Sequence, residues 1–321
     1  MASPESPLKV GVVGTGALGR HHVRILAELP EADLVGIYDL RPDVARELAE
    51  RHGTRATDSL DELGDTVDAA IVAVPTADHL TVAVHLLERG VHVLVEKPIA
   101  ATLEEADELL SHAGDRVVAV GHVEYYNPAV QALLAVEGPP GYVEIQRLAE
   151  FTPRSLDVDV VLDLMIHDLQ ILHAIDPSPV YEVRATGIHV LSDKIDIANV
   201  RLEFESGCVA NLTASRVSAE RVRKLRIFLR DRYYSLDYQD QEIEGFELLA
   251  GPDERRIQAA PLPVVKAEPL KVEVRHFIAA CNGASVALVT GQQGRRALAT
   301  ALDVLAAISG GAETAKSASS A

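Results

Sequence analysis

A glycine-rich loop, placed between an apolar run and a helical pattern, constrains the fold of this chain more than any other feature. The run LKVGVV precedes Gly14, Gly16 and Gly19, which have G-x-G-x-x-G spacing, and apolar residues at helical intervals follow. In this context the first glycine permits a tight turn, the second lets the backbone approach a pyrophosphate, and the third lets the helix pack closely on the sheet. The loop therefore predicts a dinucleotide-binding unit in which Ala17 and Leu18 also line the site. The alternative is an ordinary glycine-rich turn.

The first half of the chain alternates short apolar runs with helical patterns, which is typical of a doubly wound parallel sheet. We expect strands at 8–13, 32–39, 68–74, 91–98 and 116–123, and helices at 17–29, 41–53, 77–90 and 102–114. The expected strands read as continuous apolar runs, as strands covered on both faces do. This half therefore predicts a Rossmann domain of the α/β class, over residues 1–125.

The pattern changes after a turn cluster at residues 138–141. One helical stretch at 159–175 lies among strand-like runs, and two helices follow them at 271–283 and 291–309. The strand-like runs are 142–151, 180–191, 195–206, 208–217, 224–230 and 232–238. Successive strands favour a large, mainly antiparallel sheet. We therefore expect an α+β domain for substrate binding and oligomerisation at 126–308, whose last helix can pack back on the first domain. The small polar residues of 309–321 predict a disordered tail.

Composition limits the classes of function. The 321 residues carry a formal net charge of −18, which argues against a nucleic-acid or anionic-membrane partner because phosphate attracts basic surfaces. Two widely separated cysteines suit the cytoplasm and do not form a zinc site by themselves. The polar N-terminus leads us to expect no signal peptide, and no stretch approaches the ~20 apolar residues of a membrane span. We expect a cytoplasmic protein that binds a small molecule.

An acidic residue stands where a dinucleotide ribose would be bound. Asp39 ends the second expected strand, 20 positions beyond Gly19. A carboxylate there binds the ribose hydroxyls and repels a 2′-phosphate, so NAD is favoured over NADP. Arg41 complicates this preference, because an arginine at that place can accept the phosphate. The alternative role of Asp39 is to cap the helix that follows.

Two further strand ends carry candidate site residues. One strand leads into Pro75, Thr76 and His79, and another leads into Glu96 and Lys97. Ligands of open parallel sheets bind at the carboxyl ends of the strands. A charged pair directly after apolar residues is costly to place without a purpose, although a surface ion pair at a strand terminus would also explain it.

Taken in order, the motifs GVVGTGALGRHH, VAVPTADH, EKPIA and GHVEYYNPA resemble those of the Gfo/Idh/MocA family. The resemblance extends to about residue 310. It implies an NAD(P)-dependent oxidoreductase of sugars, cyclitols or related compounds. It also implies a catalytic lysine in the E-K-P motif, here Lys97, and a histidine on the first long helix of the second domain, here His167. The family often has an aspartate four residues earlier, here Asp163, and this spacing puts both on one face of an α-helix.

Hydride transfer from a carbinol carbon requires loss of the hydroxyl proton, so a positioned base helps most. We expect His167 to be this base, Lys97 to hydrogen-bond the same oxygen or relay the proton, and Asp163 to hold the substrate or the imidazole. Glu96 would support the cofactor or position Lys97. The alternative for His167 alone is a satisfied histidine on a partly buried helix. The doublet His21-His22 is expected to be the exposed start of the first helix.

Other polar residues are candidates for binding substrate. His122, Tyr125 and Asn127 follow the last Rossmann strand, and Arg147 and Arg154 precede the predicted catalytic helix, where they could meet an anion. A metal at His122 is rejected, because no further ligand has zinc spacing. The basic run between residues 216 and 232 is better explained as an exposed or oligomer-facing surface than as an anion site.

The segments DLMIHDLQIL and ASRVSAERVRKLRIF are similar to a branch of the family linked to oxidation of UDP-N-acetylhexosamines at C3. That reaction is our leading hypothesis. A free monosaccharide or an inositol-like cyclitol is the nearest alternative substrate. An NAD-dependent glycosidase and a non-catalytic NAD(H) sensor are the alternatives from other classes. The resemblance also implies a homodimer or homotetramer assembled through the second domain.

Overall fold

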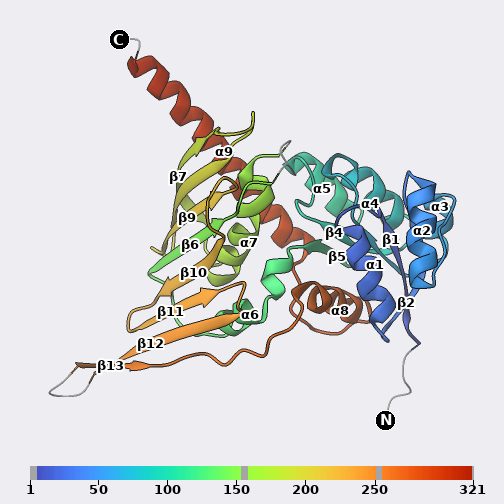
Figure 1. Ribbon diagram of the computed structural model, residues 1–321, viewed down its shortest axis with the longest axis horizontal. Coiled ribbons are helices and arrows are strands. Elements are labelled where there is room, and N and C mark those ends of the chain that lie inside the picture. Colours follow the sequence, from blue (N-terminus) through green and yellow to red (C-terminus); the bar gives the residue numbers. More distant parts are fainter. Residues whose placement is uncertain (1–5, 153–157, 251–254, 320–321) are drawn as a thin grey trace. The chain divides into compact units, whose positions relative to one another are not determined.

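The computed structural model describes residues 6–152, 158–250 and 255–319 (Figure 1). The chain divides into two compact units. The first comprises Met1–Val123 and Glu268–Arg295, and the second comprises Glu124–Ala267 and Arg296–Ala321. We expected one boundary between residues 125 and 126, with the last helix able to pack back on the first domain. In the structure, the segment 268–295, which holds the penultimate helix and only the first turn of the last one, belongs to the first unit.

The first unit contains a five-stranded parallel sheet with the order β2-β1-β3-β4-β5, which confirms the predicted Rossmann architecture. Its strands are β1 (Leu8–Val13), β2 (Ala32–Tyr38), β3 (Ala69–Val72), β4 (His92–Glu96) and β5 (Val118–Gly121). Its helices are α1 (Gly19–Glu28), α2 (Pro42–His52), α3 (Leu60–Gly64), the 3₁₀ turn η1 (Thr76–Asp78), α4 (His79–Leu87), α5 (Leu103–Ser111) and α8 (Pro269–Cys281). Each was expected from its pattern except α3 and η1.

The apolar face of α8 explains why this late segment joins the first unit. Phe277 and Val274 are fully buried in the same core cluster as Val10 of β1 and Ile25 of α1. Burying such side chains contributes about 1.5–3 kcal/mol each. Sequence proximity could not reveal this, because the partners lie more than two hundred residues earlier in the chain.

The second unit contains an eight-stranded sheet with the order β13-β12-β11-β10-β6-β9-β8-β7 (Figure 1). The predicted, mainly antiparallel sheet is confirmed: only the β6–β9 pair among the described strand pairs of this sheet is parallel. Its strands are β6 (Tyr142–Leu148), β7 (Val180–Ile188), β8 (Ile197–Phe204), β9 (Val209–Ser215), β10 (Val222–Phe228), β11 (Arg232–Asp237), β12 (Glu242–Ala250) and β13 (Arg255–Ala259). The last two were not expected.

Helices cover one face of this sheet. The helical elements of the unit are the 3₁₀ turn η2 (Val123–Tyr126), α6 (Pro128–Leu134), the π-helical turn η3 (Val161–Met165), α7 (Ile166–Ile175) and α9 (Gly291–Ser319), whose first turn belongs to the other unit. Strand β6 alternates between buried and half-buried residues, which shows that only one of its faces meets the core. Leu169 of α7 and Ala301 of α9 pack in that core with Ile145 of β6.

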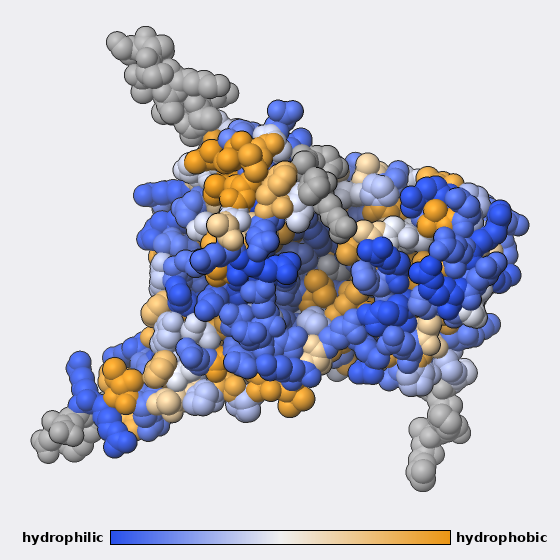
Figure 2. Space-filling model, viewed as in Figure 1, coloured by the Kyte–Doolittle hydropathy of each residue, from blue (hydrophilic) through white to orange (hydrophobic). Residues whose placement is uncertain are grey.

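The end of the chain differs from the expectation of a disordered tail at 309–321, because α9 extends to Ser319. The segment contains several alanines, and alanine has the highest intrinsic helix propensity. Among the described helices, none is long and apolar enough to cross a membrane. Hydrophilic side chains cover much of the visible molecular surface (Figure 2).

Candidate active site

The three glycines of the N-terminal loop have the three environments that their predicted roles require. Gly14 adopts a φ of +88°, where a side chain would be strained. A Cβ atom on Gly19 would lie 1.8 Å from the carbonyl oxygen of Gly14, so this position must stay bare for the helix to approach. A Cβ atom on Gly16 would meet nothing within 4 Å, which leaves its backbone open to a ligand.

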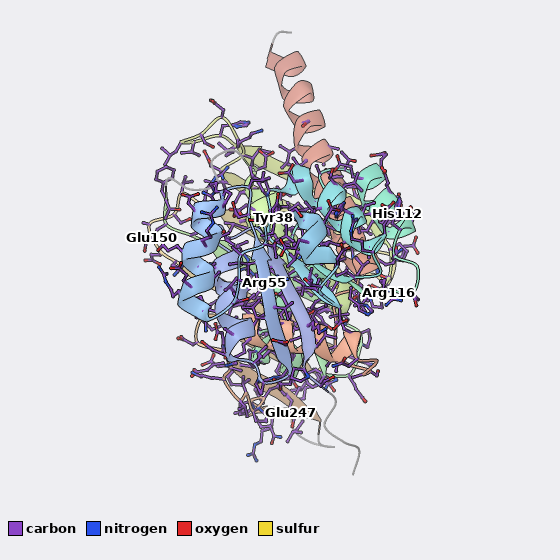
Figure 3. The ribbon with its side chains drawn as sticks, turned by 90° about the vertical axis from the view of Figure 1, so that its right-hand side faces the viewer. Tyr38, Arg55, His112, Arg116, Glu150 and Glu247 are labelled. Carbon is purple, nitrogen blue, oxygen red and sulfur yellow. The ribbon has the colours of Figure 1, made fainter. Side chains whose placement is uncertain are left out.

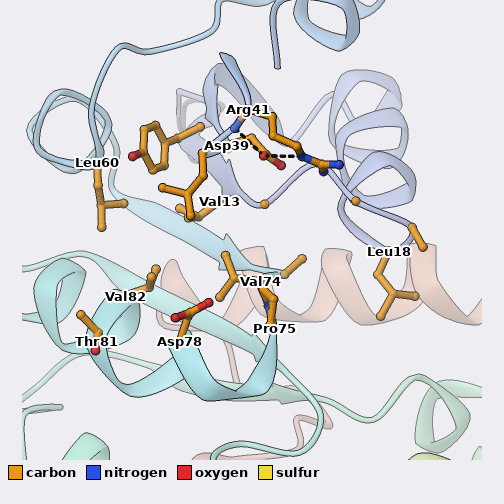
Figure 4. Close-up of a pocket in the computed structure, with 16 residues that line it drawn as sticks. Val13, Leu18, Asp39, Arg41, Leu60, Val74, Pro75, Asp78, Thr81 and Val82 are labelled. Carbon is orange, nitrogen blue, oxygen red and sulfur yellow. Dashed lines mark hydrogen bonds and ion pairs between the residues drawn. The ribbon is translucent and has the colours of Figure 1, made fainter. Parts of the chain in front are cut away.

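This open backbone faces a pocket of about 790 Å³ (Figure 4). The predicted residues that line it are Gly14, Gly16, Ala17, Leu18, Asp39, Arg41 and Pro75. Sequence reasoning missed Tyr38, Leu40, Leu60, Asp78, Thr81 and Val82 among its lining residues. Tyr38, labelled in Figure 3, could have been found, because it is the last residue of β2 and directly precedes Asp39. Asp78 belongs to the 3₁₀ turn after β3, and Thr81 and Val82 belong to α4.

Asp39 is held by four hydrogen bonds. Its Oδ2 accepts from the backbone N–H and the hydroxyl of Thr15, both at 2.7 Å, and its Oδ1 accepts from the N–H of Arg41 at 2.9 Å and from Arg41 Nε at 3.2 Å. Burial alone would raise the pKa of Asp39, but these donors lower it to about 2. The carboxylate is therefore ionised, and its bonds tie β2 to the glycine loop. They also correct the capping role considered above. The Asp39 carboxylate accepts from the N–H of Arg41, the residue before the first turn of α2, and not from an N–H group within the helix.

The pocket fits a dinucleotide by its shape and by its donors. Its backbone lies open at Gly16, and α1 begins immediately after the loop. The cap residue Leu18 is apolar, so its side chain cannot accept from the first N–H groups of the helix. These groups and the positive end of the helix dipole favour a bound phosphate.

His79 and Thr76 do not line this pocket. The ring of His79 is buried, with Nδ1 2.9 Å from the carbonyl oxygen of Pro98 and Nε2 3.0 Å from that of Val74. Burial lowers its pKa, so the ring is neutral and its single N–H donates to one of these oxygens at a time. His79 thus joins the loop after β3 to the loop that follows Lys97, a structural role in place of the predicted contact with cofactor.

Lys97 and His122 directly follow Glu96 and Gly121, which are paired residues at the ends of β4 and β5. His122 is 1% exposed, and burial together with the positive charge of Lys97 lowers its pKa to about 3. The imidazole is therefore neutral beside a cationic lysine. The structure thus brings two of the predicted site residues together at the carboxyl edge of the first sheet.

Asp163 and His167 belong to the second unit. His167 is 8% exposed in the first turn of α7, whereas Asp163 is half-buried in the π-helical turn that precedes it. The N–H of Ile166 bonds to the carbonyl oxygen of Val161, five residues earlier. The predicted spacing on one face assumed an α-helix, so the π turn changes the offset between the two side chains. Such turns are frequent at functional sites.

Arg147 is not available to a substrate anion, in contrast to our expectation. It is 3% exposed, and its Nε and Nη2 bond to Asp168 at 2.8 and 2.6 Å while Nη1 bonds to Glu124 at 2.8 Å. Burial opposes its charge, but the two carboxylates outweigh burial and raise the pKa of Arg147 well above its usual value. The ion pair instead fixes α7 to β6. Arg154 lies outside the described residues.

Two further candidates for substrate binding, Asn127 and Tyr125, follow β5. Asn127 is 2% exposed and caps α6: its Oδ1 accepts from the N–H of Ala129 at 3.0 Å and its Nδ2 donates to the carbonyl oxygen of Tyr238 at 2.9 Å. Both ends of the amide are therefore used within the protein, which corrects its prediction as a substrate ligand. Tyr125 is half-buried and packs edge-on against Tyr126, with ring centroids 5.2 Å apart.

Most cations of the basic run have carboxylate partners. Arg216 is buried against Asp196 at 2.9 Å, Arg226 bonds to Glu144 at 2.8 Å, and Arg223 bonds to Glu124 at 3.2 Å. These pairs leave three of the cations engaged within the protein, and the burial of Arg216, which is 6% exposed, differs from the exposed surface that we expected for the run. Within the described ranges, no group of three or more His, Cys, Asp or Glu side chains could hold a metal ion.

Comparisons with known proteins extend these observations. A model described as an oxidoreductase family with an NAD-binding Rossmann fold matches residues 8–122, and a model of the GFO/IDH/MocA C-terminal domain matches 118–233. The chain is 39% identical over 306 residues to a UDP-N-acetylglucosamine 3-dehydrogenase of Acidithiobacillus ferrooxidans, covering 94% of this chain and 97% of the relative. A solved structure of that enzyme matches with a TM-score of 0.88 at 38% identity, with 94% and 97% of the chains covered.

The names of less similar proteins refer to other compounds that carry several hydroxyl groups. An inositol 2-dehydrogenase/D-chiro-inositol 3-dehydrogenase of Halalkalibacterium halodurans is 27% identical, with 84% of this chain and 82% of the relative covered. A levoglucosan dehydrogenase in complex with NADH and levoglucosan has a TM-score of 0.81 at 19% identity, with 94% and 97% covered. This last likeness is evidence for the fold alone.

Proposed function

The chain belongs to the Gfo/Idh/MocA family of NAD-binding oxidoreductases, and from this premise we propose that it oxidises the C3 hydroxyl of a UDP-N-acetylhexosamine with NAD⁺. The observation that carries the substrate is the 39% identity to a UDP-N-acetylglucosamine 3-dehydrogenase over 94% of the chain. Relatives named inositol dehydrogenases are 27–35% identical over 38–84% of this chain, which makes a free cyclitol the second candidate.

The first unit would hold the cofactor. The backbone at Gly16 and the start of α1 would bind the pyrophosphate, and Asp39 would accept hydrogen bonds from the adenosine ribose. When bound, NAD⁺ accepts a hydride from the carbinol carbon. Asp39 is already saturated by internal donors, so the exposed Arg41 side chain would swing away to free an oxygen lone pair.

The proton of the substrate hydroxyl would leave to a protein base. We assign this role to His167, with Lys97 donating a hydrogen bond to the same oxygen and stabilising its developing negative charge. Asp163 would hold the imidazole or a neighbouring hydroxyl. The neutral, buried His122 would line the site beside Lys97 without adding a second positive charge. Tyr125 stays a candidate substrate contact.

Assembly is proposed to occur through the open face of the second sheet. Tyr142, Phe228, Tyr233 and Phe246 are register partners on β6, β10, β11 and β12, with successive ring centroids 5.5, 4.8 and 6.3 Å apart. We call these four residues the aromatic row. Phe228 and Phe246 are 38% and 42% exposed, and a second copy of the chain would bury them in a homodimer or homotetramer.

A cytoplasmic location is proposed on the state of the cysteines. Cys208 and Cys281 are both free thiols, and burial raises the pKa of each to about 12. Thiols that remain protonated are poor nucleophiles and suit a reducing compartment.

The test is turnover of a substrate panel. Purified protein with NAD⁺ should form NADH with UDP-N-acetylglucosamine, and mass spectrometry should find the 3-keto sugar nucleotide. Lys97→Ala should lower kcat by about 10²–10⁴-fold while NADH binding persists, and the exposed Lys194→Ala serves as the control. Turnover of inositol but not of the sugar nucleotide would support the cyclitol alternative. If the substrate is consumed but NADH never accumulates, the protein acts as an NAD-dependent glycosidase. If NAD(H) binds but no substrate is turned over, the protein acts as a sensor.

A further inference from the structure

Three titratable side chains meet inside the first unit, away from the pocket. His22 comes from α1, Glu96 from the end of β4, and Glu273 from α8; they are 0%, 7% and 0% exposed. His22 Nε2 lies 2.7 Å from Glu96 Oε1. We had expected His22 to belong to the exposed start of its helix, and only its neighbour His21 is exposed.

Gly121 leaves room for this contact because it has no side chain. Gly121 is the register partner of Glu96 on the adjacent strand, and a Cβ atom there would lie 2.9 Å from Glu96 Oε2. The Glu96 carboxylate is therefore confined between the imidazole of His22 and the strand β5. Its place is fixed by packing as well as by its hydrogen bond.

Glu273 lies beside this carboxylate and carries a protonated, neutral carboxyl group. Both of its oxygens are buried without a hydrogen-bond partner among the described residues. An isolated buried carboxylate costs several kcal/mol, so such a group takes up a proton instead. Burial and the negative charge of Glu96 raise the pKa of Glu273 well above its usual value, in agreement with a neutral carboxyl group.

Stability alone is a poor reason for this cluster. Replacing a buried ion pair by apolar side chains of similar volume is often neutral or stabilising. The position of the cluster suggests another reason. Glu96 is covalently followed by Lys97, and His22 belongs to the helix that begins in the glycine loop. The hydrogen bond thus joins the strand that carries the lysine to the helix that would bind the pyrophosphate.

We propose that His22, Glu96 and the neutral Glu273 form a positioning cluster that fixes Lys97 relative to the cofactor-binding helix. The three act through Lys97 and do not touch the reacting atoms. This inference rests on the proposed function in one respect, namely that Lys97 acts on the substrate hydroxyl. It extends that function to Glu273, which lies in none of the motifs quoted above, and to His22, which was expected to be part of the exposed start of a helix.

The principal test replaces His22 by leucine, which leaves Glu96 without its donor. Kcat for UDP-N-acetylglucosamine should fall by about 10–100-fold, because small misplacements of a reacting group cost this much. KM and the Kd for ADP-ribose should stay within about threefold, since neither the substrate pocket nor the glycine backbone is altered. His22→Gln can still donate to Glu96 and should restore most of the rate. The exposed neighbour gives the matched control, His21→Leu.

The neutral state of Glu273 has its own variant. Glu273→Gln replaces a neutral acid by a neutral amide of the same shape and should keep kcat within about twofold. A loss of more than about tenfold in a folded Glu273→Gln protein would contradict this part of the proposal.

A second readout does not need the substrate. The rate at which acetic anhydride labels Lys97, followed by peptide mass spectrometry, should change at least about threefold in His22→Leu, because burial and nearby charges set the fraction of neutral amine, while labelling of the exposed Lys194 stays constant. If the wild type does not oxidise UDP-N-acetylglucosamine, the proposed function fails, but the labelling still decides the positioning role. If His22→Leu does not fold, Glu96→Gln is judged by the same labelling. Unchanged kcat and unchanged labelling in the folded variant would overturn the proposal.

Discussion

At the scale of single residues, Asp39 holds the glycine loop to β2, and we propose that the same carboxylate binds the cofactor ribose. Its four hydrogen bonds hold Thr15 and Arg41 in place before any ligand arrives. Arg41 is the replaceable partner, because its side chain is 61% exposed, whereas the backbone donors cannot leave. A ribose hydroxyl can therefore take the place of the guanidinium at modest cost.

Removing the charge of Asp39 should weaken NADH binding and reduce the preference of the protein for NADH over NADPH. For Asp39→Asn we expect the Kd for NADH to rise about 10–100-fold, equivalent to about 1.4–2.8 kcal/mol, with a smaller change for NADPH. Fluorescence titration measures both. The exposed Asp43→Asn on α2 is the control, and an unchanged NADH affinity in Asp39→Asn would show that the ribose is bound elsewhere.

His122 should make the protein sensitive to acid. The pKa of His122 is about 3 in the folded chain, whereas its ordinary value, which applies to the unfolded chain, is 6.5. As the pH falls, the unfolded chain therefore binds a proton before the folded chain does. Stability then decreases with falling pH below 6.5, by about 1.4 kcal/mol for each pH unit. Between pH 6.5 and pH 5 this amounts to about 2 kcal/mol.

Urea unfolding at the two pH values tests this prediction. His122→Gln should lose about 2 kcal/mol less than the wild type over that interval, because glutamine does not titrate. His52→Gln, at a half-exposed site in α2, should behave like the wild type. An identical loss in the wild type and His122→Gln would mean that His122 is already charged in the folded protein.

At the scale of elements, sequence patterns predicted secondary structure best where it depends only on the residues of one segment. The strands of the first unit and the longer helices between them, but not α3, follow from apolar runs, Gly14 and the Gly53 cap of α2, which has a φ of +68°. The π turn at Asp163 was not predictable, since its residues also suit an α-helix. Strand β12 was missed because Gly245 interrupts its pattern; a Cβ atom there would lie 2.1 Å from the carbonyl oxygen of Ala260.

The site residues show the same limit. Gly14, Gly16 and Asp39 were singled out from local backbone and charge patterns, and all three line the pocket of the first unit. Arg147 was misassigned because its true partners, Asp168 and Glu124, come from other elements. A sequence shows that an arginine is present but does not show which carboxylates already bind it.

The ion pair between Arg147 and Asp168 should hold α7 in place. Breaking a buried pair leaves one charge unpaired, so Arg147→Met should lower the free energy of unfolding by about 3–5 kcal/mol. The double variant Arg147→Met/Asp168→Leu should recover part of this loss. Arg51→Met, which breaks the exposed pair with Glu47, should cost less than about 0.5 kcal/mol. Equal effects of the two single variants in urea unfolding would refute this role.

At the scale of the whole molecule, the aromatic row predicts self-association despite a net charge of −18. Charged pairs such as Arg226–Glu144 neutralise each other beside it, so a second copy would meet little net repulsion. Phe228→Asp would place a charge in the buried centre of such an interface. We expect the wild type to be a dimer or tetramer by light scattering and the variant to shift towards monomer. Exposed Val265→Asp is the control, and a monomeric wild type would contradict the proposed assembly.

The central claim is that this chain removes hydride from C3 of a UDP-N-acetylhexosamine. The most direct measurement uses UDP-N-acetylglucosamine that carries deuterium at C3, with unlabelled NAD⁺ and mass analysis of the reduced cofactor. Our account predicts that each reduced cofactor molecule carries one deuterium and that the sugar nucleotide has lost it. Reduced cofactor without deuterium would place the oxidation at another carbon, and bound NAD⁺ that is never reduced would contradict the claim.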